Sequence, residues 1–434
     1  MAACGVVTPN PTPNPTATAS PQASATATAS PTAVPTPTIV PVPTPQIDTA
    51  TTAPLVHLDA TTAAALTQTL DSIQARAGLP GIQAAIVFPD GLTWTAQAGV
   101  GVISPAVPVT AETLFSIGSV SKTFVAALVL RLAERGTIGL DDALSRYVPT
   151  FPNAAGITLR QLLSHTSGIH DLFKSPGMAD DILANTARVW TAEEVLKRLG
   201  PIYFAPGKGY HYSNSNYVLL GLVVEHVTHK SLAALIRAEF LVPLGMSHTF
   251  LQTEDLQTEE KTRGVVAHGY KGKAAAPVDL SVGQTMVPFT SEVTACGPAC
   301  AYVSDATDLA RWASALYGGG VLDRASLASM VDISITLPYK PVYPYGLGFE
   351  EISMGGRLAW GHRGHLDGFW TSMEYMPGSG LTVVVQANAD WADPFGTGTA
   401  LANVILGVAP APSPSPSVPN AHPSPSAHPS AKPS

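Results

Sequence analysis

The segment FSIGSVSKTF, residues 115–124, places Ser119 and Lys122 three positions apart. The apolar spacing that follows predicts a helix over 119–135, which ends at Gly136. Residues three apart lie on one side of a helix, so we expect the Ser119 hydroxyl and the Lys122 amine to face each other. This segment therefore predicts a Ser-x-x-Lys pair at the first turn of a helix.

Such a pair supports nucleophilic chemistry under one condition. Ser119 can attack a carbonyl only when a base takes its proton, and Lys122 is such a base only if burial and positive neighbours lower its pKa. Backbone N–H groups at the start of a helix can also stabilise an oxyanion. In the alternative interpretation, Ser119 caps the helix and Lys122 faces solvent. A phosphate-binding loop is excluded, because Ser121 stands where that loop requires a glycine.

The composition favours a globular enzyme with a small or neutral substrate. The 434 residues are 45% hydrophobic and carry a formal net charge of -8, without any basic run. Phosphate binding needs clustered lysine and arginine, so no nucleic-acid partner is expected. The longest apolar candidate for a membrane span, 123–133, is interrupted by Arg131 and is too short.

Two segments of low complexity flank one continuous globular stretch. Residues 1–54 are rich in Pro, Thr, Ala and Ser, and residues 409–434 are rich in Pro, Ser, Ala and His. These segments lack the large apolar side chains that offset chain entropy, so we expect both to be disordered spacers. Residues 55–408 are predicted to form one globular domain.

The three cysteines bear on the cellular compartment. Small residues precede Cys4 in MAACG, as at bacterial lipoprotein cleavage sites, so Cys4 is either lipidated after a missing signal peptide or an accidental cysteine. Cys296 and Cys300, in ACGPAC, form either a short-loop disulfide or two free thiols. With either interpretation of Cys4, the spacer composition favours an extracytoplasmic location, where a lipid anchor would be the membrane contact.

Hydrophobic periodicity predicts antiparallel strands at both ends of the domain and helices between them. The predicted strands are 82–88, 91–100, 357–362, 369–376 and 381–388. The other predicted helices are 60–78, 158–164, 191–199, 215–228, 231–240, 305–317 and 395–406. This order implies an α+β fold in which an antiparallel sheet is flanked by helices, with an inserted and mostly helical subdomain.

Seven segments, taken in chain order, resemble the serine β-lactamase and penicillin-binding protein superfamily. They are LFSIGSVSKTF (114–124), GLDDALSRYVP (139–149), ITLRQLLSHTSGI (157–169), FAPGKGYHYSNSNYVLLG (204–221), FLVPLGMSHT (240–249), AYVSDATDLARWA (301–313) and GHRGHLDGF (361–369). The resemblance covers 60–407 and is to the branch with class C β-lactamases, D-Ala-D-Ala carboxypeptidases and related esterases. It implies a β-lactamase-like fold.

The resemblance assigns roles to four residues. It implies that Ser119 is the nucleophile and that Lys122 is its base. In the Tyr-Ser-Asn motif, Tyr212 would shuttle protons, and Asn214 would hold the lysine and the amide of the substrate. A tyrosine at its usual pKa of about 10 is a poor base, so we expect the charge of Lys122 to lower the pKa of Tyr212.

The third motif departs from the family pattern. Lactamases of this branch carry Lys-Thr-Gly or Lys-Ser-Gly on the strand beside the site, where this chain has His362, Arg363 and Gly364. An unperturbed histidine is mostly neutral at pH 7, which weakens capture of a substrate carboxylate. On a regular strand, Arg363 would point away from the face that His362 and Gly364 share. By resemblance, the substrate lies along this strand, and the N–H groups of Ser119 and His365 hold the oxyanion.

Together these residues predict a serine acyl-transfer hydrolase. We expect no cofactor and no metal, because the polar residues His165, His170, Asp171 and His211 lack the spacing of zinc ligands. His165 is expected to make a structural hydrogen bond, and the chain is expected to be a monomer that binds a small-molecule or peptide substrate.

The resemblance favours one activity and leaves others open. The favoured activity is that of a penicillin-binding D-alanyl-D-alanine carboxypeptidase, and the alternatives within the family are a small-ester esterase and a class C-like β-lactamase. The alternative of another class is a catalytically idle protein that binds cell-wall fragments or β-lactams.

Overall fold

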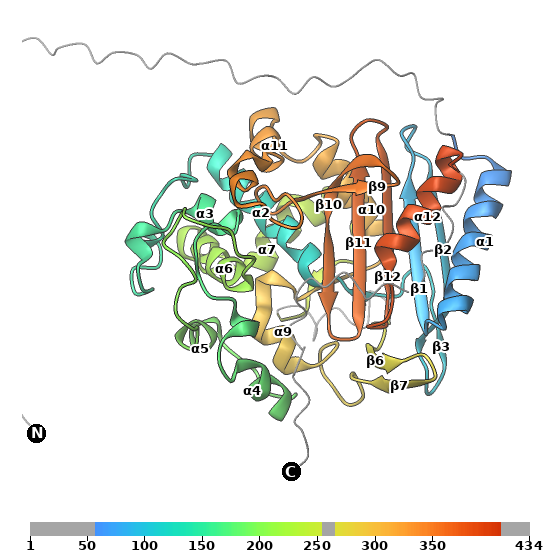
Figure 1. The fold of residues 1–434 in the computed structure, drawn as a ribbon, viewed down its shortest axis with the longest axis horizontal. Coiled ribbons are helices and arrows are strands. Elements are labelled where there is room, and N and C mark those ends of the chain that lie inside the picture. Colours follow the sequence, from blue (N-terminus) through green and yellow to red (C-terminus); the bar gives the residue numbers. More distant parts are fainter. Residues whose placement is uncertain (1–56, 254–264, 409–434) are drawn as a thin grey trace, which may run out of the picture. The chain divides into compact units, whose positions relative to one another are not determined.

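A seven-stranded antiparallel sheet is the centre of the structure (Figure 1). The computed structural model describes residues 57–253 and 265–408, so the predicted spacers 1–54 and 409–434, and Cys4 with them, lie outside the described residues. The strands are β1 (Gly81–Val87), β2 (Thr93–Val102), β3 (Val107–Pro108), β4 (Phe115–Ser116), β5 (Phe250–Leu251), β6 (Tyr270–Lys273), β7 (Ala276–Asp279), β8 (Tyr302–Ser304), β9 (Glu350–Met354), β10 (Arg357–Leu366), β11 (Phe369–Met376) and β12 (Leu381–Ala387). The sheet order is β3-β2-β1-β12-β11-β10-β9, so the pairing of β1 with β12 joins the start of the domain to its end.

Helices lie on both faces of this sheet and beside it. They are α1 (Ala60–Ala77), α2 (Ser121–Glu134), α3 (Leu159–Leu163), α4 (Met178–Ala184), α5 (Ala192–Lys197), α6 (Asn214–Thr228), α7 (Leu232–Ile236), α9 (Thr290–Cys296), α10 (Ala306–Tyr317), α11 (Arg324–Met330) and α12 (Pro394–Leu406). Short 3₁₀ turns are η1 (Gly118–Val120), η2 (Leu144–Arg146), η3 (Ala154–Gly156), η4 (Leu172–Lys174), η6 (Gly297–Ala299), η7 (Ile333–Ile335) and η8 (Leu337–Tyr339), and η5 (Arg237–Leu241) is a π-helical turn.

Strand β1 shows why the sheet needs cover on both faces. Side chains alternate along a strand, so neighbouring residues enter different cores. Ile82, Ala84 and Ile86 pack in the cluster that α1 and α12 cover, whereas Ala85 packs in the cluster with α2 and α10. All four are buried, which is why β1 is apolar along most of its length.

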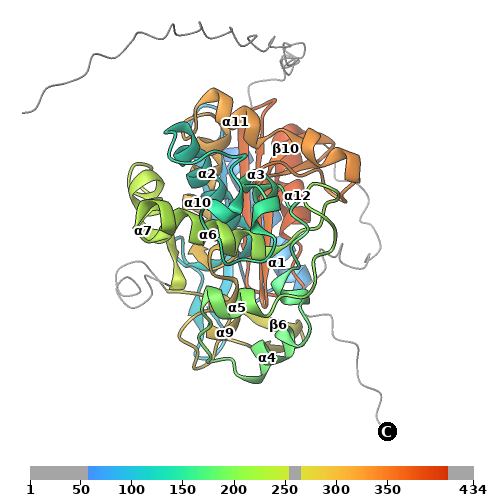
Figure 2. The ribbon, with the colours of Figure 1, turned by 90° about the vertical axis from the view of Figure 1, so that its left-hand side faces the viewer.

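The middle of the chain forms a mostly helical region beside the sheet. Figure 1 places α3, α5, α6 and α7 next to the sheet, and Figure 2 shows the same helices from their own side. The predicted α+β fold, an antiparallel sheet flanked by helices with a helical insertion, is confirmed.

Local sequence patterns predicted the bounds of several elements correctly. Helix α1 begins where Asp59 accepts the N–H of Thr62 at 2.7 Å and ends at Gly78, whose φ of 59° only glycine adopts easily. The predicted strand 369–376 is β11 without change, and 381–388 is β12 with one residue fewer. Helices 305–317 and 395–406 each match within one residue.

Other boundaries were wrong. The predicted helix 119–135 begins only at Ser121, because Gly118 has a φ of 49° and the chain first makes the turn η1. The predicted strand 357–362 continues to Leu366, and the helix 231–240 becomes π-helical after Ile236. The shortest strands and the helices α4, α9 and α11 were not predicted, because pieces of two to seven residues depend on distant partners.

In the described part of the chain, no helix by itself has the length and apolar composition to cross a membrane. The segments Asn214–Thr228 and Leu232–Leu241 pass that test only as a pair, which is bent by 78°.

Candidate active site

A pocket lies where turn η1, the start of α6 and strand β10 meet. Its walls include Ser119, Asp171, Tyr212, Asn214, Arg363, Gly364 and His365. Lys122 lies directly beneath Ser119 and is completely buried. The structure therefore brings together the four residues to which the sequence assigned the acyl-transfer chemistry.

Lys122 has three hydrogen-bond partners. Its Nζ lies 3.0 Å from Ser119 Oγ, 2.8 Å from Asn214 Oδ1 and 2.9 Å from the carbonyl oxygen of Ala299. Burial lowers the pKa of Lys122 to about 7, although two nearby carboxylates raise it. A large share of Lys122 is therefore neutral near pH 7, which is the condition that a lysine base requires.

The arrangement of these partners orients a neutral Lys122. A neutral amine has two N–H groups and one lone pair. Asn214 Oδ1 and Ala299 O can only accept hydrogen bonds, so they take the two N–H groups. The lone pair is left for the Ser119 hydroxyl, which then donates to Nζ. This is the geometry in which Lys122 can remove the proton of Ser119.

Asp171 fixes the orientation of Asn214. Its Oδ1 accepts the backbone N–H of Asn214 at 2.8 Å and the side-chain Nδ2 at 3.0 Å. Because Nδ2 is held in this way, Oδ1 of the same amide faces Lys122. Burial raises the pKa of Asp171, while the hydrogen bonds from Asn214 lower it. Sequence reasoning treated Asp171 only as a rejected metal ligand and missed this contact, for which the local sequence gives no signal.

Tyr212 has a pKa shifted in the opposite direction from the one expected. Burial raises its pKa well above 10, while a hydrogen bond with Ser119 lowers it. Lys122 Nζ lies 4.9 Å from the centre of the Tyr212 ring, yet the loss of water around the phenol outweighs any effect of that charge. The prediction that Lys122 lowers the pKa of Tyr212 is wrong. A protonated Tyr212 is suited to donate a proton and not to act as the resting base.

The backbone around Ser119 packs directly against β10. Strand β9 pairs only with the first half of β10, so the second half faces turn η1 instead. A Cβ on Gly118 would lie 2.7 Å from the backbone N of His365, and one on Gly364 would lie 3.2 Å from the backbone N of Ser119. These two glycines therefore let the N–H groups of Ser119 and His365 lie close together, where the resemblance placed an oxyanion site.

His362 and Arg363 point to opposite faces of β10, as the strand pattern predicted. His362 is 1% exposed and is not among the residues that line the pocket; its Nε2 lies 3.0 Å from the Tyr345 hydroxyl. Arg363 is among the residues that line the pocket, but its guanidinium lies 3.6 Å from the ring centre of Tyr343 and 5.8 Å from that of Phe395 in α12, and its Nε donates to Glu350 at 3.0 Å. The ring of His362 lies on the side of Tyr212, with 6.3 Å between the two ring centres, and the contact of His362 with substrate stays a prediction.

His165 makes the structural hydrogen bonds that the sequence suggested. Its Nδ1 accepts the backbone N–H of Ser213 at 3.2 Å and the side-chain Nδ2 of Asn216 at 3.0 Å. Burial lowers the pKa of His165 well below 6.5, so the ring is neutral. His165 thereby holds the Tyr-Ser-Asn motif in place from beneath.

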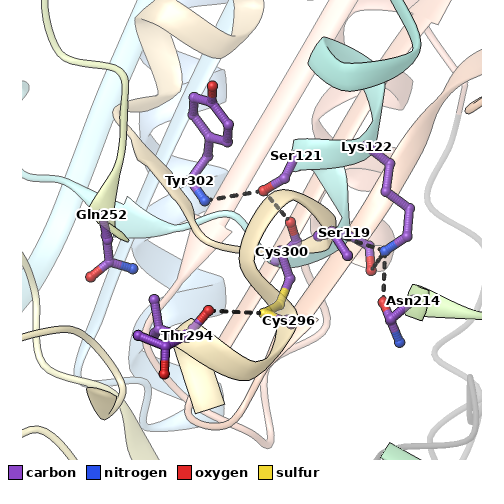
Figure 3. Close-up of a disulfide and its surroundings, with 12 residues drawn as sticks. Ser119, Ser121, Lys122, Asn214, Gln252, Thr294, Cys296, Cys300 and Tyr302 are labelled. Atoms are coloured by element: carbon purple, nitrogen blue, oxygen red, sulfur yellow. Dashed lines mark hydrogen bonds between the residues drawn. A yellow bond between two sulfur atoms is a disulfide. The ribbon is translucent and has the colours of Figure 1, made fainter. Parts of the chain in front are cut away.

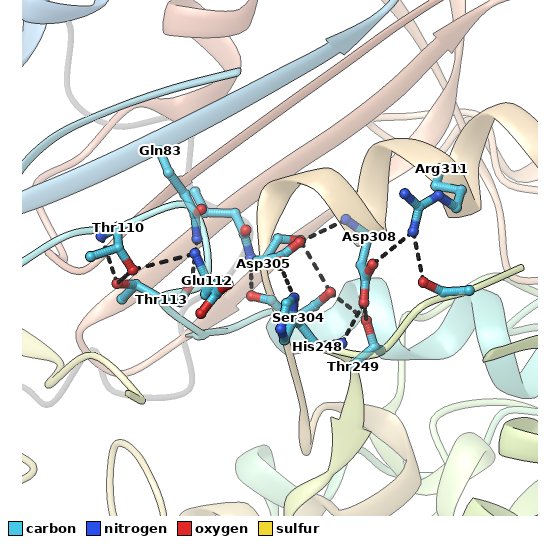
Figure 4. Close-up of polar contacts among 12 residues, drawn as sticks. Gln83, Thr110, Glu112, Thr113, His248, Thr249, Ser304, Asp305, Asp308 and Arg311 are labelled. Carbon is cyan, nitrogen blue, oxygen red and sulfur yellow. Dashed lines mark hydrogen bonds and ion pairs between the residues drawn. The ribbon is translucent and has the colours of Figure 1, made fainter. Parts of the chain in front are cut away.

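Two groups of histidine and acid side chains in the described part of the chain lie close enough to share an ion. They are His248 with Asp305 and Asp308 (Figure 4), and His365 with Asp367 and Asp390. In the first group Arg311 donates to Asp308 at 3.2 Å, and in the second Lys271 lies 3.0 Å from Asp367. A cation of the protein therefore already holds one carboxylate of each group, and neither group contains a residue that was considered as a zinc ligand.

Cys296 and Cys300 are joined as a disulfide around turn η6 (Figure 3). Both cysteines are buried, and Cys300 lines the same pocket as Ser119. Of the two interpretations left open by the spacing, the structure has the bridged one.

Comparison with known proteins agrees with this geometry. The Beta-lactamase family model matches residues 66–404. Penicillin-binding protein 4* of Bacillus subtilis is 30% identical over 61% of this chain, and the unguisins hydrolase ungD' of Aspergillus campestris is 29% identical over 79% of it. The chain spans 58% and 64% of the lengths of these curated relatives. The structure of D-amino acid amidase from Ochrobactrum anthropi SV3 complexed with D-phenylalanine superposes with a TM-score of 0.66, at 27% identity, and covers 80% of this chain and 98% of that one.

The fold and the pocket are similar to those of serine hydrolases. The chain belongs to the Beta-lactamase family.

Proposed function

We propose that the protein hydrolyses amide bonds at the carbonyl of a D-amino acid, through an acyl-enzyme on Ser119. The observation that carries the proposal is the orientation of Lys122, whose two acceptors leave its lone pair for the Ser119 hydroxyl. The D-specificity is supported by likeness to the D-amino acid amidase and to a D-stereospecific amidohydrolase from Streptomyces sp., which is 26% identical with a TM-score of 0.65.

The proton steps follow from the resting protonation states. Neutral Lys122 takes the proton of Ser119 while Ser119 Oγ bonds to the substrate carbonyl, and the N–H groups of Ser119 and His365 hold the oxygen that gains charge. Tyr212, which is protonated, gives its proton to the leaving nitrogen as the carbon–nitrogen bond breaks. Lys122 then returns the proton to Tyr212. Water then hydrolyses the ester on Ser119, and the proton transfers run in the reverse order.

The third motif offers little for a substrate carboxylate. His362 is 1% exposed with its Nε2 bonded to the Tyr345 hydroxyl, and the charge of Arg363 is already paired with Glu350, which is 1% exposed. This arrangement favours substrates whose leaving group is uncharged, such as amides and short peptides with a blocked end. The D-alanyl-D-alanine carboxypeptidase activity is the case in which the leaving group carries a carboxylate, and we rank it second.

A third candidate function is the hydrolysis of small esters. The same lack of a carboxylate anchor favours it, since an ester needs only the nucleophile and the oxyanion site. A class C-like β-lactamase is disfavoured for the same reason, because β-lactams carry a carboxylate. A binding protein without turnover is opposed by the Ser119 and Lys122 geometry.

Turnover of four substrates by one preparation tests the proposal. We expect D-phenylalanine amide to be hydrolysed at least about 100-fold faster than L-phenylalanine amide, and faster than D-alanyl-D-alanine. Ser119→Ala should abolish this turnover, whereas Ser329→Ala, on the remote helix α11, should leave it unchanged. Preference for D-alanyl-D-alanine would make the protein a carboxypeptidase, and turnover of 4-nitrophenyl acetate alone would make it an esterase. No turnover of any of them, with unchanged penicillin binding in Ser119→Ala, would leave a binding protein.

We further propose that the enzyme works outside the cytoplasm as a monomer, with Cys4 as a site of lipid attachment. The Pro/Thr/Ser-rich composition of 1–54 and the disulfide support the compartment. Cell fractionation tests the compartment, and a cytoplasmic protein would contradict it. Light scattering tests the monomer, which an oligomeric mass would contradict. The mass of the native N-terminal peptide tests lipid attachment, which an unmodified peptide would contradict.

A further inference from the structure

Turn η6 separates the pocket of Ser119 from a second cavity. On one side, Cys300 lines the pocket and the carbonyl of Ala299 accepts a hydrogen bond from Lys122 at 2.9 Å. On the other side, Gly297 and Pro298 line a cavity of about 280 Å³ among the described residues. The turn therefore borders an open space on the side away from the active site.

The disulfide acts on a buried turn that packs against α2, α6 and α9. Pro298 packs against α6 at Gly221, where a Cβ would come within 2.7 Å of the proline ring. Within the turn, the N–H of Cys300 donates to the Gly297 carbonyl at 3.1 Å, and the N–H of the next residue donates to the same oxygen at 2.9 Å. The disulfide joins the two ends of the turn and is the covalent restraint on it (Figure 3).

The position of the Ala299 carbonyl matters for chemistry and not only for packing. It is one of the two acceptors that fix the N–H groups of neutral Lys122. If this oxygen moves away, one N–H is free to rotate toward Ser119, and the lone pair no longer points at the hydroxyl. The nucleophile pair would remain in contact but lose its direction of proton transfer.

We propose that the Cys296–Cys300 disulfide is a positioning element of the nucleophile pair, which keeps the Ala299 carbonyl on Lys122 Nζ. The inference rests on the proposed roles of Ser119 and Lys122. Neither cysteine touches the reacting atoms; both act through the carbonyl between them.

Loss of the disulfide should raise the pKa of Lys122. Burial is the largest cause of its lowered pKa, and a loosened turn η6 admits water from the cavity behind it. The pKa of Lys122 then rises from about 7 toward its usual value of 10.5. The neutral amine is the active form, so the acylation rate rises with pH as Lys122 loses its proton. This rise, the acid limb of the rate profile, therefore moves to higher pH.

The experiment compares pH profiles of acylation in a Cys4→Ser background, in which Cys296 and Cys300 are the remaining thiols. The Cys296→Ala/Cys300→Ala variant and the oxidised parent are acylated with 4-nitrophenyl acetate between about pH 5 and pH 10. We expect the acid limb of the variant to lie at least about one unit higher, with acylation at least about tenfold slower at pH 7 and a smaller loss near pH 9.5 that comes from the misdirected lone pair. An unshifted limb would overturn the inference.

A matched control separates positioning from general stability. Val383→Ala removes buried volume from the core on the other face of the sheet and should lower the melting temperature without moving the limb. A shifted limb in Val383→Ala would show that destabilisation alone moves it, and would overturn the inference.

The parent protein provides a second form of the test. A phosphine reduces the disulfide to two thiols and is itself oxidised to the phosphine oxide, with one water molecule supplying the oxygen and the two protons. Iodoacetamide then blocks the thiols, as mass spectrometry can verify. This form should show the same shift, and unfolding of both this form and the cysteine variant would make the bridge a structural staple and defeat the proposal. Acylation that survives Ser119→Ala in the oxidised protein would instead refute the proposed function.

Discussion

Replacing Asp171 by asparagine separates the charge of this residue from its shape. The amide oxygen of Asp171→Asn can still accept both hydrogen bonds from Asn214, so the Asn214 amide keeps facing Lys122. The negative charge that stabilises the Lys122 ammonium is lost. We therefore expect the pKa of Lys122 to fall.

The size of this fall can be worked from the structure. The path from Lys122 Nζ to Asn214 is 2.8 Å, and that from Asn214 Nδ2 to Asp171 is 3.0 Å, which places the carboxylate oxygen at most about 8 Å from Nζ. At an effective dielectric constant of about 20, two charges at this distance interact by roughly 2 kcal/mol, or about 1.5 pKa units. The pKa of Lys122 would then fall from about 7 to about 5.5.

The assay is the pH profile of acylation by 4-nitrophenyl acetate. Lys122 acts as a base when neutral, so a lower pKa moves the acid limb to lower pH. The ratio of the variant rate to the wild-type rate should rise on the order of tenfold between about pH 8 and pH 5.5, whatever the loss at the plateau. Asp279→Asn, which removes a carboxylate paired with His268 away from the pocket, should show a flat ratio. A flat ratio for Asp171→Asn, or a limb moved upward, would refute the electrostatic reasoning.

Three further predictions follow from β10 and its neighbours. In Gly364→Ala the new Cβ would overlap the Ile117 carbonyl oxygen, so ester turnover should fall at least about 100-fold as the oxyanion donors separate; near-normal turnover would contradict the close approach. Burial raises the pKa of Glu374 to about 8, so the wild type should lose stability, on the order of 4 kcal/mol, as pH rises from about 4.5 to 8, and Glu374→Gln should remove that slope in urea titrations. Arg363→Met removes the guanidinium that bonds the buried carboxylate of Glu350 and should cost about 3–5 kcal/mol of unfolding free energy, which the added Glu350→Gln should largely restore. An unchanged urea midpoint in the single variant would disprove the pairing.

The sequence by itself determined the features that depend on neighbours in the chain. The three-residue spacing of Ser119 and Lys122 survives a change from helix to 3₁₀ turn, because both geometries keep them on one side. Capping residues and apolar periodicity placed α1, β11 and β12, since these signals act over a few residues. The motifs in their order were enough to imply the family.

Only the tertiary structure decided the chemistry of the site. Lys122 obtains its acceptors from residues 92 and 177 positions away, and burial by these segments is what lowers its pKa. The same burial raises the pKa of Tyr212, against the expectation from charge alone. The strand pattern predicted that His362 and Arg363 face opposite ways, but not that Tyr345 and Glu350 already bond these two side chains, because those partners come from other segments that pack on β10. Burial and long-range hydrogen bonds arise from contacts between distant segments, and a local pattern carries no record of them.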